Sequence, residues 1–271
     1  MRLTILVLAL AVPLSVPVAA CTGVVISRDG TTVVGVNEDW YRPNAYLWAD
    51  RALGKAHAVV YFGYEIDDEF GPNDTPYWYE FQGINSAGLF FDSFSAPCSD
   101  RDPDVVLPPY SGSIERMIMR RCATVAEAAD LMTQYDRSFT NCRQYLLVDR
   151  TGAAVVVEYG DVVWMEGETF AVTNFHLSDP SDGHYPCWRY DIATRFLEAD
   201  SEASVERVAR ILDSAEHVST MYSIVWSLTE TEAYVYCIGN YARPLRVDLE
   251  TLWAEGSGYV LLSSLPRANA N

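Results

Sequence analysis

The chain has 271 residues, of which 49% are hydrophobic and 13% aromatic, and its formal net charge is −18 with Lys55 as the one lysine. This composition excludes a disordered chain, and the negative charge disfavours nucleic acid and anionic membrane surfaces as partners. No P-loop, dinucleotide fingerprint or G-x-S-x-G elbow occurs, and the histidines lack metal-ligand spacing, so we expect no cofactor and no metal. The histidines are His57, His176, His184 and His217.

The first twenty residues have the features of a secretory signal peptide. A short positive start is followed by a largely apolar run at residues 3–16 and by Val18-Ala19-Ala20, the kind of small residues found before a cleavage site. The apolar run is too short for a permanent membrane span. We therefore expect a signal peptide at 1–20 and an exported protein, periplasmic or secreted, whose residues 21–271 form one domain.

Alternating β-branched residues and turn signals predict strands at both ends of the mature chain, with helices in the middle and again after residue 187. Arg28-Asp29-Gly30 predicts the turn of a first hairpin, and Thr124 with Glu127 predicts a capping box. Strands are expected at 22–27, 31–40, 58–65, 77–82, 88–94, 144–148, 153–159, 161–166, 169–175, 221–227, 232–238 and 245–249. Helices are expected at 113–122, 125–135, 188–198 and 204–215. This order predicts an α+β fold in which helices cover antiparallel sheets.

Removal of residues 1–20 would leave Cys21 as the first residue, with both a thiol and a free α-amine. A thiol reacts as its thiolate and needs a base within hydrogen-bonding reach. The α-amine, with an ordinary pKa of about 7.7–8.0, can be that base on the same residue. We therefore expect Cys21 to be a nucleophile created by cleavage and, as the opening residue, to contribute little packing.

Two other interpretations of Cys21 stay open at this point. It could be a disulfide or core cysteine that falls near the cleavage site. Val18-Ala19-Ala20-Cys21 also fits the pattern at which bacterial lipoproteins are cut and lipidated, which would make the protein a surface-anchored binding module. Lipidated cysteines are usually followed by a flexible polar tether, whereas β-branched residues follow here at once.

Several segments resemble the N-terminal-nucleophile (Ntn) hydrolases of the choloylglycine hydrolase and penicillin acylase group. The first is "CTGVVISRDGTTVVGVNEDW" at 21–40, with a Cys-Thr start and a Gly-x-Asn-x-Asp-aromatic return strand. Others follow in the family's order: "GINSAGLFF" at 83–91, "VTNF" at 172–175, "CWRYDIATRF" at 187–196 and "TMYSIVWSLTETEAYVYC" at 220–237. In detail, with Asn-Ser-Ala-Gly at 85–88, the chain resembles the acyl-CoA:6-aminopenicillanate acyltransferase branch more than it resembles bile salt hydrolases.

The resemblance implies a four-layer αββα sandwich and a cysteine amidohydrolase that cleaves linear, non-peptide amides, with acyl transfer as a further activity. It implies that Cys21 is nucleophile and base, and that Asp39 orients its amine and thiol. Asn174 would donate its side-chain amide to the oxyanion, and Arg189 would lie near the nucleophile. Without the resemblance, Asp39 would be a turn or capping residue, Asn174 a loop asparagine and Arg189 a solvated helix residue.

Two departures from the family concern the substrate. Bile salt hydrolases have an arginine where this chain has Val36 and an asparagine where it has Ser95. Fewer polar groups near the thiol disfavour bile salts as substrates, and we expect N-acyl compounds with an apolar or aromatic acyl group. The run "PYWYEF" at 76–81, with Trp40, Tyr41 and Trp48, could line an acyl pocket, although aromatics at strand spacing more often form core.

The disulfide pattern cannot be assigned from the spacings. Export would permit disulfides, but apart from Cys21 an odd number of cysteines remains, so at least one is unpaired within the chain. The pairing is open among Cys98, Cys122, Cys142, Cys187 and Cys237.

Overall fold

The structure, a computed structural model, describes residues 20–40, 42, 44–66, 77–98, 107–136, 140–179, 187–200, 202–237 and 239–265. Residues 1–19, nearly all of the predicted leader, lie outside this range. No helix in the described part is both long and apolar enough to cross a membrane.

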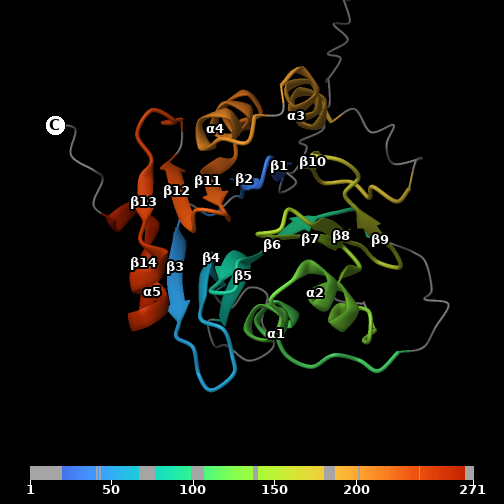
Figure 1. Cartoon of the computed structure of the whole chain (residues 1–271), viewed down its shortest axis with the longest axis vertical. Helices are drawn as coiled ribbons and strands as arrows, with labels where there is room; N and C mark the ends of the chain where they lie inside the picture. Colours follow the sequence, from blue (N-terminus) through green and yellow to red (C-terminus); the bar gives the residue numbers. More distant parts are fainter. Residues whose placement is uncertain are drawn as a thin grey trace, which may run out of the picture.

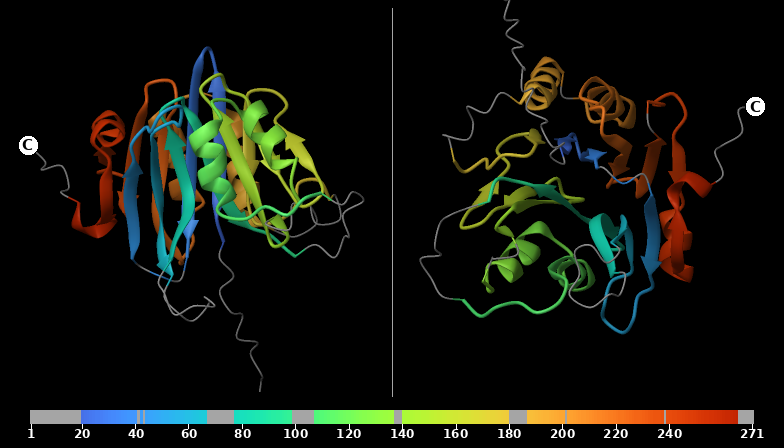
Figure 2. Two further views of the ribbon diagram at one scale, coloured as in Figure 1. Left: turned by 90° about the horizontal axis from the view of Figure 1, so that it is seen from below. Right: turned by 180° about the vertical axis from the view of Figure 1, so that it is seen from behind.

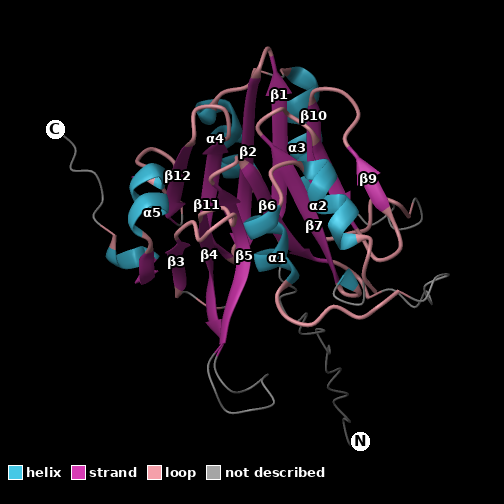
Figure 3. Ribbon diagram, turned by 60° about the horizontal axis from the view of Figure 1, so that its bottom comes forward, coloured by secondary structure: helices cyan, strands magenta, loops and turns pink. Residues whose placement is uncertain are grey.

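Strands of the described residues form two antiparallel sheets of six and eight strands. The order in the first is β10-β1-β2-β11-β12-β13, and its strands are β10 Thr169–Val172, β1 Thr22–Arg28, β2 Thr31–Asp39, β11 Thr220–Ser227, β12 Glu232–Cys237 and β13 Leu245–Val247. The order in the second is β14-β3-β4-β5-β6-β7-β8-β9, and its strands are β14 Ser257–Leu261, β3 Ala45–Asp50, β4 Val59–Ile66, β5 Tyr77–Asn85, β6 Leu89–Ser95, β7 Arg143–Asp149, β8 Ala154–Val157 and β9 Val162–Trp164. Figure 3 shows the strands of both sheets running in roughly one direction, as in aligned sheet packing.

The hairpin of β1 and β2 lies inside the six-stranded sheet and positions Cys21, the predicted start of the mature chain. Its turn has two positive backbone angles, φ 52° at Asp29 and φ 78° at Gly30, as a two-residue hairpin of the primed type requires. The predicted Asp-Gly turn is therefore confirmed. Side chains then alternate, so that Val24 packs under the helices while Val25 points between the sheets.

Helices cover the outer face of each sheet, which gives four layers (Figure 1). Helices α1 (Ile114–Arg121) and α2 (Val125–Met132) pack on the eight-stranded sheet, and α3 (Trp188–Ala199) and α4 (Val205–Ser214) on the six-stranded sheet. The predicted capping box of Thr124 and Glu127 opens α2. The predicted αββα sandwich is confirmed.

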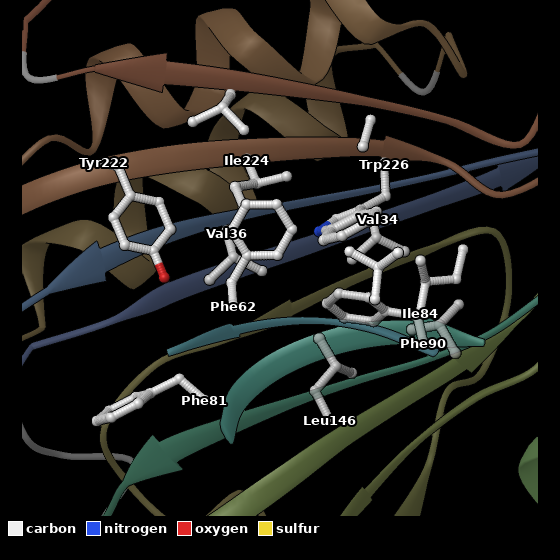
Figure 4. Packing of buried hydrophobic residues seen from close by; sticks show 14 of the residues in the cluster. Val34, Val36, Phe62, Phe81, Ile84, Phe90, Leu146, Tyr222, Ile224 and Trp226 are labelled. Atoms are coloured by element: carbon white, nitrogen blue, oxygen red, sulfur yellow. The ribbon is translucent and has the colours of Figure 1, made fainter. Parts of the chain in front are cut away.

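The core between the sheets is filled by large apolar side chains (Figure 4). Trp226 is completely buried and meets the ring of Phe62 edge-on at a centroid distance of 5.4 Å. Its indole Nε1 donates to Oε1 of Gln82 at 3.0 Å, so the buried indole is satisfied. Each such side chain contributes roughly 1.5–3 kcal/mol by burial.

Three elements of the described chain were not predicted, and several predicted strands are shorter than expected, including those at 153–159, 161–166 and 169–175. Strand β3 extends the eight-stranded sheet, and α5 (Leu249–Glu255) with β14 lies at one lateral edge of the sandwich (Figure 2). The strand expected at 245–249 ends at Val247, because Asp248 caps α5 by accepting from the backbone N–H of Thr251. A disulfide joins Cys98 to Cys142, and the other four cysteines are free thiols.

Candidate active site

Strand register places Cys21 between two polar residues. Thr22 pairs with Asn37 on β2, so one further step along the hairpin sets Cys21 opposite Glu38. On its other side β1 pairs with β10, and extending that register brings Asn174 alongside Cys21. The side chain of Cys21 points into the space between the sheets.

Arg189, near the start of α3, connects the predicted site residues. Its Nη1 donates to the backbone carbonyl of Cys21 at 2.5 Å and to the hydroxyl of Thr22 at 3.0 Å, and its Nη2 donates to Oδ1 of Asn174 at 3.2 Å. Nη1 also lies 3.8 Å from Oδ2 of Asp39. Arg189 is buried, with 6% of its surface exposed, so the interpretation of it as a solvated helix arginine is wrong. The structure thus brings all four predicted residues together.

Asp39 ends β2 on the face of the sheet that α3 covers. It is fully buried, and its Oδ1 accepts a hydrogen bond from the hydroxyl of Thr220. No hydrogen bond from a described residue reaches Oδ2. Burial raises the pKa of Asp39 to about 7, and the Thr220 hydroxyl and Arg189 offset only part of that effect. The free Oδ2 can therefore accept from a further donor, and a cation there would favour the ionised carboxylate.

The thiol of Cys21 is enclosed, with 2% of the residue exposed. The expectation that Cys21 contributes little packing is therefore wrong. Burial raises the pKa of the thiol well above its ordinary value, and Glu38, Asp39 and Asp92 raise it further. In the chain with residue 20 attached, Cys21 is a neutral thiol.

Asn174 follows β10 and has a fixed amide orientation. Arginine has only donors, so the atom that accepts from Arg189 must be the amide oxygen, and Nδ2 is the donor. One N–H of Nδ2 is directed at the backbone carbonyl of Ser95 at 2.8 Å. An amide nitrogen carries two N–H groups, so the second can serve an oxyanion.

A cavity of about 440 Å³ adjoins these residues. It is lined by Ala20, Ser95, Ala96, Pro97, Asn174, Phe175, Cys187, Trp188, Arg189 and His217. No carboxylate occurs among these lining residues, in a chain of net charge −18. Because Ala20 lines the cavity, removing the residue before Cys21 would widen the cavity toward the thiol.

The aromatic residues that line this cavity are not those of the 76–81 run, whose described aromatic side chains belong to or pack beside the core, as is more common for aromatics at strand spacing. Phe175 and Trp188 line the cavity, whereas Trp40 and Phe81 pack against each other at 5.1 Å beside the core between the sheets. Trp48 belongs to the core under α1 and α2. Tyr41 and Pro76 lie outside the described residues.

His176, the most plausible alternative base, is engaged elsewhere. Its Nε2 lies 2.8 Å from the backbone carbonyl of Pro97, and its Nδ1 lies 3.8 Å from a carboxylate oxygen of Glu158. His184 lies outside the described residues. No group of three or more potential ligands suited to a metal occurs among the residues that the structure describes.

Sequence reasoning missed a set of buried polar residues that the two sheets bring to the thiol. Glu38 is fully buried with Oε2 at 3.8 Å from Sγ of Cys21, and Gln82 on β5 donates to its Oε1 at 2.9 Å. Asp92 on β6 is also fully buried, and the charge of Glu38 adds to burial in raising the pKa of Asp92. A local signal existed, because Glu38 and Asp92 each interrupt an otherwise apolar strand face.

Comparisons with known proteins identify the fold. No family model matches the chain, and no curated protein matches it by sequence. Among solved structures, a variant of conjugated bile acid hydrolase from Clostridium perfringens is similar with a TM-score of 0.62 at 14% identity, covering 92% of this chain and 97% of the other. Penicillin V acylase from Agrobacterium tumefaciens has a TM-score of 0.52 at 15% identity, covering 90% and 87%.

These likenesses define the class of fold. The chain has the fold of the Ntn hydrolases, as its sequence motifs predicted, over nearly the whole described length. At this identity the likeness concerns architecture, and the chemistry must be argued from the residues themselves.

Proposed function

We propose that this protein is an exported cysteine amidohydrolase that cleaves linear, non-peptide amides of N-acyl compounds through a thioester on Cys21. The observation that carries the proposal is the position of Arg189, whose guanidinium contacts Cys21, Thr22 and Asn174 and lies 3.8 Å from Asp39. Four residues predicted from three separate motifs meet beside a cavity. Such a cluster of a nucleophile, an amide donor and perturbed carboxyls is typical of a catalytic site.

The reaction begins once the peptide bond between Ala20 and Cys21 is cut. The thiol proton passes to the α-amine, and Sγ forms a bond to the substrate carbonyl carbon. Charge on the carbonyl oxygen is stabilised by Nδ2 of Asn174 and a backbone N–H. The C–N bond then breaks as the ammonium returns its proton to the leaving amine.

The thioester is resolved by water, or by an acceptor amine where acyl transfer occurs. The α-amine takes a proton from the attacking group, and the Cys21 sulfur leaves and is reprotonated. Asp39 holds the amine through its unpartnered Oδ2, and Arg189 holds the Cys21 carbonyl so that the terminal residue cannot rotate.

The cavity supports a small N-acyl substrate with an apolar or aromatic acyl group in preference to bile salt conjugates. Ala96, Pro97, Phe175 and Trp188 supply apolar walls, and none of the described residues that line the cavity has a carboxylate. A panel of N-phenoxyacetyl, fatty-acyl and bile salt amides compared by kcat/KM tests this preference. A clear preference for bile salts would contradict it.

Lipidation of Cys21, the alternative from the sequence, is disfavoured by the same geometry. A thioether-linked lipid needs Sγ at the surface, whereas Cys21 is 2% exposed and faces Glu38 between the sheets. The mass of the N-terminal peptide from the native host separates the two, because lipidation adds hydrocarbon mass and hydrolase maturation leaves a free Cys21.

The decisive test compares one protein in two forms, starting at Cys21 or carrying an uncleavable Gly-Ser extension. The extension converts the amine into an amide that accepts no proton near neutral pH. We expect a loss of at least about 100-fold in kcat/KM, the usual contribution of general-base assistance. Cys21→Ala in the short form is the inactive control, and equal melting temperatures show that both forms are folded. Equal rates in the two forms would exclude the amine as base.

A further inference from the structure

A buried carboxyl lies directly against the nucleophile and has no part in the mechanism above. Oε2 of Glu38 is 3.8 Å from Sγ of Cys21, and both residues are almost completely enclosed. The other oxygen is fixed, because Gln82 donates to Oε1 at 2.9 Å and is itself held by the indole of Trp226 at 3.0 Å. Glu38 therefore has one orientation, with a single oxygen left for the sulfur.

Glu38 forms a pair with a second buried acid, Asp92 of β6. Both carboxyl groups are fully buried, and no hydrogen bond from a described donor reaches either oxygen of Asp92. The charge of Glu38 adds to burial in raising the pKa of Asp92. Two interacting carboxyl groups in a buried site cannot both ionise, because water solvates neither charge. The pair therefore carries at least one proton.

We propose that Glu38 is a positioning residue for the Cys21 nucleophile, holding the sulfur through Oε2 while its pairing with Asp92 limits the negative charge beside it. The inference rests on the proposed function. When the thiol proton moves to the α-amine, the O–H of neutral Glu38 donates to the thiolate, and that proton stays on the carboxyl. Sγ is thus kept from turning away from the substrate, and its charge is stabilised.

The cations near this site are the α-amine of Cys21 in the form that begins there and Arg189, which contacts the Cys21 carbonyl. The ionisable side chains of described residues that interact with Glu38 itself are all acids, so the site is sensitive to high pH. These groups are Cys21 before β1, Asp39 on β2, Tyr64 on β4, Asp92 on β6 and Tyr222 on β11. Burial raises the pKa of Glu38 to about 8 and raises that of Asp92 as well. Glu38 is therefore neutral below that pH, and its ionisation at higher pH places a negative charge against the thiolate.

The experiment compares wild type, Glu38→Gln and Glu38→Leu, all starting at Cys21. Glutamine keeps the shape, accepts from Gln82 and donates to Sγ but cannot ionise, whereas leucine fills a similar volume without the polar contact. Glu80→Gln is the matched control, because Glu80 is a buried acid of β5 that pairs with Arg116 on α1 rather than with Cys21.

Two readouts are measured from pH 5.5 to 9.5. The first, which needs no substrate, is the rate at which iodoacetamide alkylates the Cys21 sulfur, measured by peptide mass. We expect the midpoint of the rise in alkylation rate with pH to lie at least one pH unit lower in Glu38→Gln than in wild type or Glu80→Gln. The second is kcat on an N-acyl amide, expected to be at least tenfold lower in Glu38→Leu than in Glu38→Gln, with KM unchanged.

An unmoved alkylation midpoint in Glu38→Gln, or equal kcat in Glu38→Gln and Glu38→Leu at equal melting temperatures, would overturn the role of Glu38. The two proposals fail separately. If wild type hydrolyses no N-acyl amide, the proposed function is wrong, and the alkylation midpoint still decides whether Glu38 acts on Cys21. If wild type is active and the midpoint does not move, the function stands and the role of Glu38 is refuted.

Discussion

Replacing Asp39 with asparagine should change how the stability of the protein depends on pH. The test uses the form with an uncleavable residue before Cys21, which matches the structure described here. Asp39 is fully buried with a pKa of about 7, against an ordinary value of 3.8. Between these values the folded state binds a proton that the unfolded state has released. The contribution of Asp39 to stability is therefore full below pH 4 and is lost as the pH rises through 7.

The size of this effect follows from the interval between the two pKa values. At 1.36 kcal/mol per pH unit, the total is about 4 kcal/mol, of which about 2.5 kcal/mol is lost between pH 5 and pH 8. Asparagine keeps the shape and a partner for Thr220 but cannot titrate. Between pH 5 and pH 8, the free energy of unfolding of wild type should thus fall by about 2.5 kcal/mol more than that of Asp39→Asn.

Urea unfolding at pH 5 and pH 8, followed by tryptophan fluorescence, measures this difference. Asp213→Asn, at an exposed position on α4, is the control and should behave as wild type. Equal losses in wild type and Asp39→Asn would refute the reasoning. In the form that begins at Cys21, an ammonium beside Asp39 would favour the carboxylate, so the loss should shrink.

Three further predictions concern packing, the disulfide and the arginine. Gly35→Ala should lower the free energy of unfolding in urea by about 1–3 kcal/mol, because an added Cβ would lie 2.2 Å from the side chain of Val208. Gly258→Ala, where the added Cβ meets open space, should leave the free energy of unfolding unchanged, and equal stability of the two variants would contradict the packing at Gly35. Replacing Cys98 and Cys142 with serine should lose about 4 kcal/mol, the chain-entropy value for a loop closed over 44 residues, and a non-reducing peptide map without this link would contradict the pairing. Arg189→Lys should lower kcat at least about 100-fold, because one ammonium cannot reproduce the forked contacts, and activity near wild type would exclude this role for the fork.

The fold was predictable where a local signal fixes the backbone. The Asp29-Gly30 turn and the Thr124–Glu127 capping box are of this kind, since each depends on residues within four positions of one another. Strand β3 was missed because it is held by pairing with β4 and β14, contacts that no local pattern encodes. Helix α5 is only seven residues long, and β14 is partly exposed and contains an internal glycine. Neither segment therefore shows a clear periodicity of apolar residues.

The site was predictable to the extent that a family resemblance named it. Asp39 and Asn174 look like ordinary strand-end residues, and only the motifs around them suggested chemistry. Glu38, Gln82 and Asp92 come from three strands of two sheets, so their meeting depends on how the sheets stack. A charged residue on an apolar strand face signals a buried partner but does not say which one.

Charge balance gives a physical reason for a cysteine at the junction between the predicted leader and the first strand. Glu38, Asp39 and Asp92 lie around Cys21, and among the described residues Arg189 is the one cation that the contacts above place beside it. While residue 20 is attached, burial keeps the thiol neutral, and the nearby acids add to that effect. Under the proposed function, cleavage adds an ammonium at the backbone nitrogen of Cys21, within the same cluster. The new charge would offset the carboxylates, favour the thiolate and bring the base into place in a single step.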